Sequence, residues 1–229
     1  MKTVGIIGGL GPETSAKFLL DLNFEFIGVL NKVRPPILLW NVPMDLKKEK
    51  RIILNGKEEE FFLGLLKDGA QRLEKGGVDF IVIPCNTAHL FIDEVRNSVK
   101  IPVLSIIEET AKALTRQSVQ KVGLMATGLI VKKNLFGEEF KKHNIDVVFP
   151  NKDDQIKTNI IINDLVLGKN KKIHQKEFNS IINNFKKHNV FSVLLACTDL
   201  QLLNPKSEKI TFFDTLKILQ ESTLRKISE

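Results

Sequence analysis

The sequence predicts an α/β protein of two similar doubly wound parallel-sheet domains, related by pseudo-two-fold symmetry, with the functional site in the cleft between them. Two observations predict this fold. Apolar strand-like runs alternate with helical stretches along the 229 residues, which is typical of parallel sheets covered by helices. The same order of elements then occurs twice, which indicates an internal repeat.

The first half reads as a strand, a glycine-rich turn and then alternating helices and strands. Pro12 in the turn suits the first position of a helix, and Gly76 stops a long helix whose apolar residues recur at helical spacing. The expected elements are strand 3–8, turn 8–13, a helix to about 29, strand 36–42, helix 57–74, strand 78–84, a helix from about 87, strand 101–105 and a helix to about 116.

The second half starts the pattern again. Val4 matches Val122 at an offset of 118 residues and Cys85 matches Cys197 at an offset of 112, a difference that loops can absorb. Asp214 is expected to cap the terminal helix. The expected elements are a strand and glycine turn over 121–128, a helix to about 143, strand 145–150, helices 154–167 and 176–187, strands 190–198 and 209–215, and a terminal helix.

The terminal strand and helix are expected to return to the first half, because chain termini often lie close together. We therefore predict a first α/β domain of residues 1–102 plus 206–229, and a second of residues 103–205.

Composition excludes several classes of function. We interpret the net charge of +7 as a lysine-rich solvated surface rather than a nucleic-acid site, because the lysines are scattered and no stacking aromatic residues accompany them. No run approaches the roughly 20 apolar residues that span a bilayer, and the N-terminus resembles a first strand rather than a signal peptide. With no secretion signal, both cysteines are expected to be reduced, in the cytoplasm. The positive potential suits a small anionic substrate.

Cys85 lies where an apolar strand turns polar, in "IVIPCNT". Unpaired backbone N–H groups and the helix dipole at such a junction are expected to lower a thiol pKa from about 8.5. The alternative is an inert packed cysteine, since free Cys is often buried.

Cys197 occupies the same junction in the second half, in "VLLACTD". Ligands of open parallel sheets bind beyond the carboxyl ends of the strands, so the two thiols are expected to flank one small ligand. Two facing thiols suit racemisation at a carbon alpha to a carboxylate, because one thiolate removes a proton from one face while the other thiol returns one to the opposite face. Asn86, Thr87 and Thr198 are placed to hold the carboxylate.

Four segments, "VGIIGGLGPE", "PCNTAH", "SIIEETAK" and "ACTDL", have an order and spacing similar to those of the aspartate/glutamate racemase superfamily, and most closely its aspartate racemase branch. The resemblance implies an amino-acid racemase that interconverts L- and D-aspartate without pyridoxal phosphate, other cofactor or metal, commonly as a homodimer. It implies that Cys85 and Cys197 are the catalytic pair. The substrate-binding residues that it implies are Gly9, Leu10, Gly11, Asn86, Thr87, Thr127 and Thr198.

The sequence departs from that family in two places. Asp199 stands where the family usually has Glu after Cys-Thr. Aspartate racemases also tend to place an Arg after the second strand to hold the distal carboxylate, whereas this chain has Lys47 and Lys48 there. We predict that Lys47 or Lys48 contacts the distal carboxylate, with Lys169 as the second basic residue. A lysine lacks the bidentate fork of arginine, so glutamate or a broader set of amino acids is the alternative substrate.

Other functions compete with this interpretation. His89 could join Cys85 in a zinc site, but zinc needs three or four ligands and the sequence near Cys197 offers only Asp199. The "GGLGP" turn lacks the spacing of a dinucleotide fingerprint. A non-catalytic carboxylate-binding paralogue and a redox sensor with a Cys85–Cys197 disulfide are alternatives of another class, although thiols that hold a substrate between them lie too far apart for a disulfide.

Overall fold

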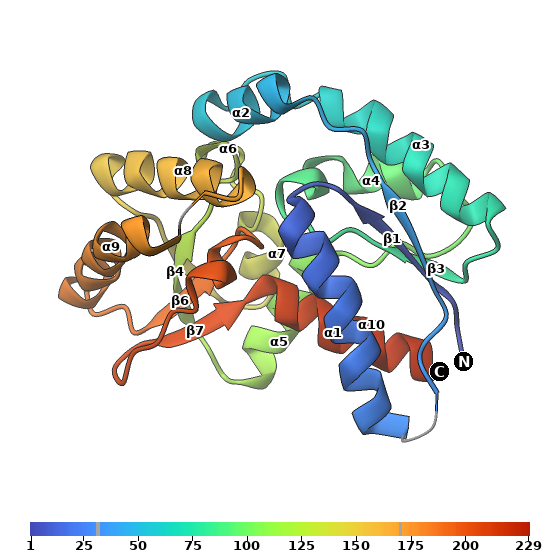
Figure 1. Cartoon of the computed structure of the whole chain (residues 1–229). Helices are drawn as coiled ribbons and strands as arrows, with labels where there is room; N and C mark the ends of the chain where they lie inside the picture. The colour runs from blue at the N-terminus through green and yellow to red at the C-terminus, as the bar shows by residue number, and fades with distance from the viewer. Residues whose placement is uncertain (31–32, 170) are drawn as a thin grey trace.

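In the computed structural model, which describes residues 1–30, 33–169 and 171–229, two parallel sheets lie beside each other with helices around them (Figure 1). The first sheet has the strand order β2-β1-β3 and the second has the order β5-β4-β6-β7, and every pairing is parallel. The predicted fold class is confirmed. The strands are β1 (Val4–Gly8), β2 (Ile37–Asn41), β3 (Phe80–Val82), β4 (Lys121–Met125), β5 (Asp146–Val148), β6 (Ser192–Leu195) and β7 (Thr211–Asp214).

The two sheets repeat one topology, because the first strand of each half lies between its second and third strands. Val103 forms an isolated bridge to Ile81 at the edge of β3, in the place where β7 pairs with β6. The strand predicted over 101–105 is therefore reduced to one bridge. Pro102 has no N–H to donate, so a longer ladder cannot form there.

Helices cover the sheets at most of the predicted positions, with three differences. Asp45 caps a helix that the sequence analysis left out, and Gly56, in the left-handed conformation (φ 60°), ends it, so the next helix begins at Phe61 rather than 57. The helix predicted to about 143 is two helices, because Asn134 adopts φ 49° between them. The helices are α1 (Pro12–Leu30), α2 (Leu46–Asn55), α3 (Phe61–Lys75), α4 (Ile92–Arg96), α5 (Ile106–Arg116), α6 (Gly128–Lys133), α7 (Gly137–Lys142), α8 (Lys152–Val166), α9 (Gln175–Lys187) and α10 (Thr215–Ser228), with 3₁₀ helices at Thr87–Phe91, Lys171–His174 and Leu200–Leu203.

The terminal helix joins the two halves. α10 packs against α5 and α1, and Lys2 N donates to Ile227 O at 2.9 Å, so the two termini lie close together (Figure 1). Asp214 caps α10 as predicted, accepting from Leu216 N at 2.8 Å. The prediction that the terminal strand returns to the first half is wrong, since β7 pairs with β6 in the second sheet. The domain boundaries at 102/103 and 205/206 stay a prediction.

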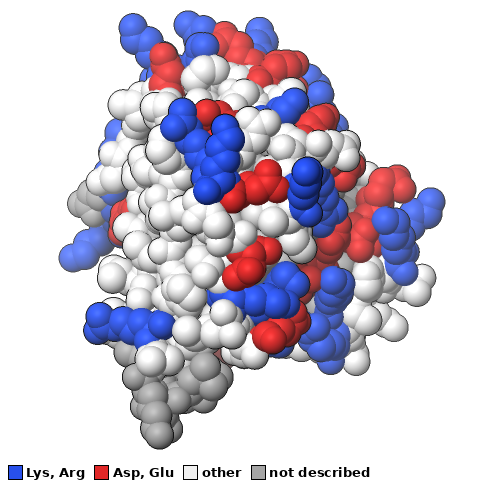
Figure 2. Space-filling model, turned by 90° about the vertical axis from the view of Figure 1, so that its right-hand side faces the viewer, with Lys and Arg blue, Asp and Glu red and all other residues white. Residues whose placement is uncertain are grey.

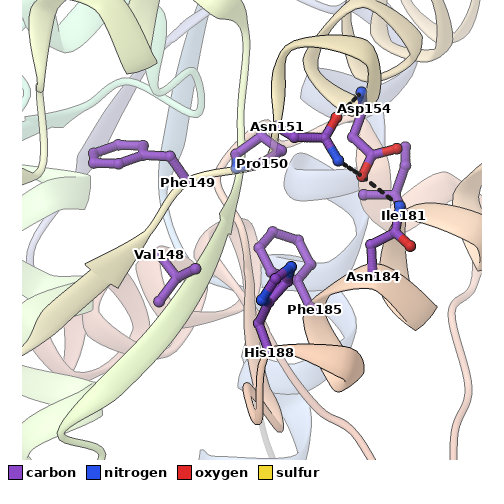
Figure 3. Close-up of a pocket in the computed structure, with 9 residues that line it drawn as sticks. All are labelled: Val148, Phe149, Pro150, Asn151, Asp154, Ile181, Asn184, Phe185 and His188. Carbon is purple, nitrogen blue, oxygen red and sulfur yellow. Dashed lines mark hydrogen bonds between the residues drawn. The ribbon is translucent and has the colours of Figure 1, made fainter.

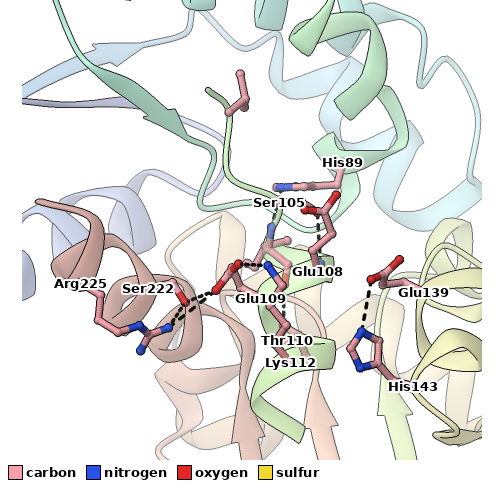
Figure 4. Close-up of polar contacts among 12 residues, drawn as sticks. His89, Ser105, Glu108, Glu109, Thr110, Lys112, Glu139, His143, Ser222 and Arg225 are labelled. Carbon is pink, nitrogen blue, oxygen red and sulfur yellow. Dashed lines mark hydrogen bonds and ion pairs between the residues drawn. The ribbon is translucent and has the colours of Figure 1, made fainter. Parts of the chain in front are cut away.

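The "SIIEETAK" segment supplies polar contacts between α5 and α10. Ser105 caps α5, accepting from Glu108 N at 3.3 Å. Glu109 accepts from Ser222 of α10 at 2.8 Å and from Lys112 at 2.8 Å, and Arg225 lies 3.7 Å from the same carboxylate (Figure 4). The segment therefore fixes one half of the protein to the other.

The surface charge is mixed. On the face shown in Figure 2, Lys and Arg side chains lie among Asp and Glu side chains rather than in a separate stripe. Pairs such as Arg72 with Asp68 and Lys142 with Glu139 are of this kind. Among the described residues, no helix is long and apolar enough to cross a membrane.

We expect Leu219→Ala to destabilise both halves together by about 2–5 kcal/mol, because Leu219 is fully buried in a core that α1, β4 and α5 share with α10. Urea denaturation should show one transition at lower urea. The control Leu20→Ala, at a residue that is 54% exposed, should change the free energy of unfolding by less than about 0.5 kcal/mol. Two separate unfolding transitions, of which only one moves to lower urea in the variant, would contradict a core shared by the two halves.

Candidate active site

Both cysteines line one cavity between the two halves, which we call the central cavity. Its walls come from turns at the carboxyl ends of β1, β3, β4 and β6, from one face each of α2 and α8, and from Phe62 in the first turn of α3. The cavity has a volume of about 30 Å³. The lining residues are Leu10, Gly11, Glu49, Ile52, Ile53, Phe62, Cys85, Asn86, Thr87, Thr127, Ile162, Val166, Cys197, Thr198 and Asp199.

Backbone N–H groups of the turn that follows each cysteine favour its thiolate. Those of Ala88 and Thr87 act on the Cys85 pKa, and that of Asp199 acts on the Cys197 pKa. Both cysteines are free thiols. The two halves therefore present their thiols through equivalent turns, as the repeat predicts.

The pKa of each thiol is raised rather than lowered. Burial raises the pKa of Cys85 to about 12, opposed by the Ala88 N–H and reinforced by the negative charges of Asp199 and Glu49. Burial, and then Asp199, also raise the pKa of Cys197 well above its ordinary value. The expected lowering of the thiol pKa by a helix dipole is wrong, because burial outweighs the backbone N–H groups, two carboxyl groups share the cavity, and Cys85 is followed only by a short 3₁₀ helix. A thiolate in this cavity would be stabilised by a positive charge beside it, which would lower the thiol pKa.

Asn86 presents a free acceptor. The hydroxyl of Thr215 donates its one proton to Leu195 O at 3.0 Å, so it must accept from Asn86 Nδ2, which lies 2.9 Å away. This fixes the amide orientation. Asn86 Oδ1 is buried and has no hydrogen-bond partner among the described residues. The site therefore offers a carbonyl oxygen to a donor on a ligand.

Three threonines bring hydroxyl groups from both halves. Thr87 Oγ1 lies 3.4 Å from Thr127 Oγ1, and Thr198 Oγ1 donates to Pro84 O at 3.2 Å. Each of these pairs joins the first half to the second. The predicted Thr87, Thr127 and Thr198 thus line the central cavity together.

The glycine turn after β1 brings Leu10 and Gly11 to the central cavity. Gly11 has φ 92°, and a Cβ there would lie 2.8 Å from an Asp199 carboxylate oxygen, so glycine is needed at this close approach. Gly9 does not line the cavity; its N–H donates to Ser15 Oγ at 3.0 Å and holds the turn.

Two buried carboxyl groups lie in the cavity that sequence reasoning did not assign to it. Asp199 accepts from Thr14 Oγ1 at 2.6 Å and lies 3.9 Å from the Cys197 sulfur, and burial raises its pKa to about 6. Glu49 is 6% exposed, and burial, then the charge of Asp199, raise its pKa to about 7. Among the described residues, the Glu49 carboxylate makes no hydrogen bond or ion pair. Asp45, as a helix N-cap, is the sequence signal that predicts α2, and the helical spacing of Glu49, Ile52 and Ile53 predicts its buried face.

The predicted lysines lie outside the central cavity. Lys47 is exposed, Lys48 Nζ lies 3.9 Å from the centre of the Phe61 ring, and Lys169 pairs with Asp164 at 2.7 Å. α2 turns Glu49 and its neighbours Ile52 and Ile53 inward, which leaves its lysines on other faces. No Lys or Arg lines the cavity in the part of the chain that the structure describes.

His89 holds the Cys85 turn in place. Its Nε2 accepts from Ile106 N at 3.0 Å, so its Nδ1–H donates to Cys85 O at 2.8 Å. Burial lowers the His89 pKa to about 4, which keeps the ring neutral. Both ring nitrogens are engaged by backbone, so His89 is a positioning residue. Within the described ranges, no three His, Cys, Asp or Glu side chains gather as metal ligands.

A second hollow of about 250 Å³ lies past the end of β5 (Figure 3). Phe149 and Phe185 are among the residues that line it. Its one carboxylate, Asp154, accepts from Asn151 at 3.0 Å and Asn184 at 2.8 Å. The hollow lacks a thiol and carries no nucleophile comparable to those of the central cavity.

Comparison with known proteins agrees with this geometry. A family model described as Asp/Glu/hydantoin racemase matches residues 7–223. The chain is 25% identical to the broad specificity amino-acid racemase RacX of Bacillus subtilis over 96% of each chain. Among solved structures it resembles an aspartate racemase from Picrophilus torridus (26% identity, TM-score 0.82, covering 100% of this chain and 95% of that one). It also resembles an aspartate racemase homologue from Pyrococcus horikoshii (26% identity, TM-score 0.76, covering both chains fully).

We expect His89→Gln to make the free energy of unfolding less dependent on pH between about 7 and 4. The unfolded chain protonates His89 near its ordinary pKa of 6.5, whereas the folded protein does so only near 4, so wild-type stability is lost as the pH falls through this window. The difference in free energy of unfolding between wild type and variant should shrink by up to about 3 kcal/mol from pH 7 to pH 4. Urea denaturation measures it, with His188→Gln, at an exposed position, as the control. A difference that is constant with pH would show that His89 is not buried neutral.

Proposed function

The chain belongs to the Asp/Glu/hydantoin racemase family, and from this premise we propose that it racemises free amino acids by proton transfer between Cys85 and Cys197, without a cofactor. One observation carries the proposal. The only two cysteines of the chain come from equivalent turns of the two halves and line the same cavity.

The reaction needs two groups that each carry one proton. The thiolate of one cysteine takes the proton from Cα and becomes a thiol. The thiol of the other gives its proton to the opposite face of Cα and becomes the thiolate. The configuration is inverted and the two cysteines have exchanged protonation states, so the enzyme is ready for the reverse reaction.

Charge that develops during proton removal spreads into the substrate carboxylate. The hydroxyl groups of Thr87 and Thr127 and the N–H groups that follow Cys85 supply donors for it. The substrate ammonium meets acceptors, namely Asn86 Oδ1 and the Asp199 carboxylate. The positive charge of the ammonium group also lowers the pKa of a neighbouring thiol, because it stabilises the thiolate.

A broad set of amino acids is the substrate range that we propose. The resemblance to aspartate racemases favours aspartate, and a solved relative carries that name. The central cavity gives less support, because no basic side chain among its described residues can pair with a distal carboxylate. RacX, which is similar along nearly the whole chain, is named for broad specificity. The homodimer and the cytoplasmic location stay predictions.

We expect Cys85→Ser and Cys197→Ser each to lower kcat for racemisation by about 10²–10⁴-fold, since a serine hydroxyl is a far weaker acid and base at neutral pH. Purified protein without added cofactor, assayed by chiral chromatography on a panel of L- and D-amino acids, measures this. Ser180→Ala, on an exposed face of α9, is the control. Near-normal activity in either cysteine variant would refute the two-thiol mechanism.

A further inference from the structure

The wall of the central cavity that α2 and α8 form has an unusual composition. Ile52 and Ile53 of α2 are almost fully buried there, and Ile162 of α8 adds a further apolar surface. Phe62 of α3, also almost fully buried, lines the same cavity. Glu49 is the one charged side chain on this wall among the described residues. A ligand that extends from the cysteines along this wall therefore meets hydrocarbon together with one carboxylate.

The charge of the central cavity disfavours an acidic side chain. Glu49 and Asp199 both line it, and no Lys or Arg in the described part of the chain does. Aspartate would add a third carboxyl group without a basic partner, in a site where burial weakens screening by water. An uncharged side chain would leave Glu49 buried without a hydrogen bond.

The substrate ammonium does not require Glu49. Asn86 Oδ1 is a buried acceptor without a partner, and its orientation is fixed by Thr215. Asp199, beside Cys197, provides the charge for the same group. Glu49 then remains available for a second cation.

We propose that the preferred substrates are amino acids whose side chain ends in a cation on a short methylene stem, with the stem along Ile52 and Phe62 and the cation on Glu49. This assignment rests on the proposed racemase function and names the substrate class of that site. It makes Glu49 the residue that determines specificity. A cationic side chain neutralises the charge of Glu49. The α-ammonium and α-carboxylate groups of the substrate then lie beside the thiols.

L-Ornithine and L-norvaline test the proposal, because their side chains share three carbons and only ornithine ends in an ammonium group. We expect wild-type kcat/KM to be higher for ornithine than for norvaline by about tenfold or more, and lowest for L-aspartate. Glu49→Gln keeps the shape of the side chain and removes its charge, so the ornithine/norvaline ratio should fall by about tenfold. Glu58→Gln, at an acidic residue paired with Arg51 outside the cavity, should leave the ratio unchanged.

Two results would overturn the assignment. One is a wild-type preference for aspartate or norvaline over ornithine. The other is an ornithine/norvaline ratio that Glu49→Gln does not change, which would mean that Glu49 and Asp199 share the α-ammonium instead.

Binding separates this failure from a failure of the proposed function. Calorimetry on Cys85→Ser should show tighter binding of L-ornithine than of L-norvaline or L-aspartate, without turnover. Absence of racemisation with every amino acid in wild type refutes the racemase. Racemisation with equal ornithine and norvaline binding refutes only the role of Glu49.

Discussion

Burial of two thiols in one cavity, with no Lys or Arg among its described lining residues, is the constraint on which the rest of the site depends. The pKa of Cys85 is raised to about 12, so forming its thiolate costs about 4 kcal/mol more than in water. Asp199 and Glu49 add to this cost, and the N–H groups of Ala88 and Thr87 reduce it. In the proposed mechanism the positive charge comes from the ligand, which links the acidity of the thiols to the identity of the substrate.

That arrangement requires the two halves to keep a fixed relation. α5 and α10 follow equivalent edges of the two sheets and pack on each other, with Glu109 and Ser222 bonded across the contact. His89 connects the start of α5 to the carbonyl of Cys85, so the helix pair and the first thiol turn are positioned together. Near the second thiol, Thr198 reaches Pro84 of the opposite half. Packing far from the cavity thus controls the placement of the two thiols.

The features that follow from a repeated pattern could be predicted from the sequence. The alternation of strands and helices predicts the two parallel sheets, the equivalent positions of Cys85 and Cys197 predict one shared cavity, and Asp214 is predicted as a helix cap. The sequence does not predict which side chains of a helix face the cavity. The segment after β2 contains several lysines and one inward acid, and only the rotation of α2 shows that Glu49 enters the cavity while Lys47 and Lys48 stay outside. The direction of the thiol pKa shift is also not predictable from the local sequence. Burial and carboxyl groups that are distant in sequence raise the Cys85 pKa by more than the neighbouring backbone N–H groups lower it.

Solvent deuterium tests the central claim, that the two thiols act on opposite faces of one carbon, most directly. A single L-amino acid is incubated with the enzyme in D2O, and both enantiomers are recovered early in the reaction. The two-thiol account predicts deuterium at Cα in the D product and almost none in the recovered L substrate, because the proton removed at one face is not the one returned at the other. Deuterium that enters the recovered substrate as fast as the product would indicate a single base and contradict the account.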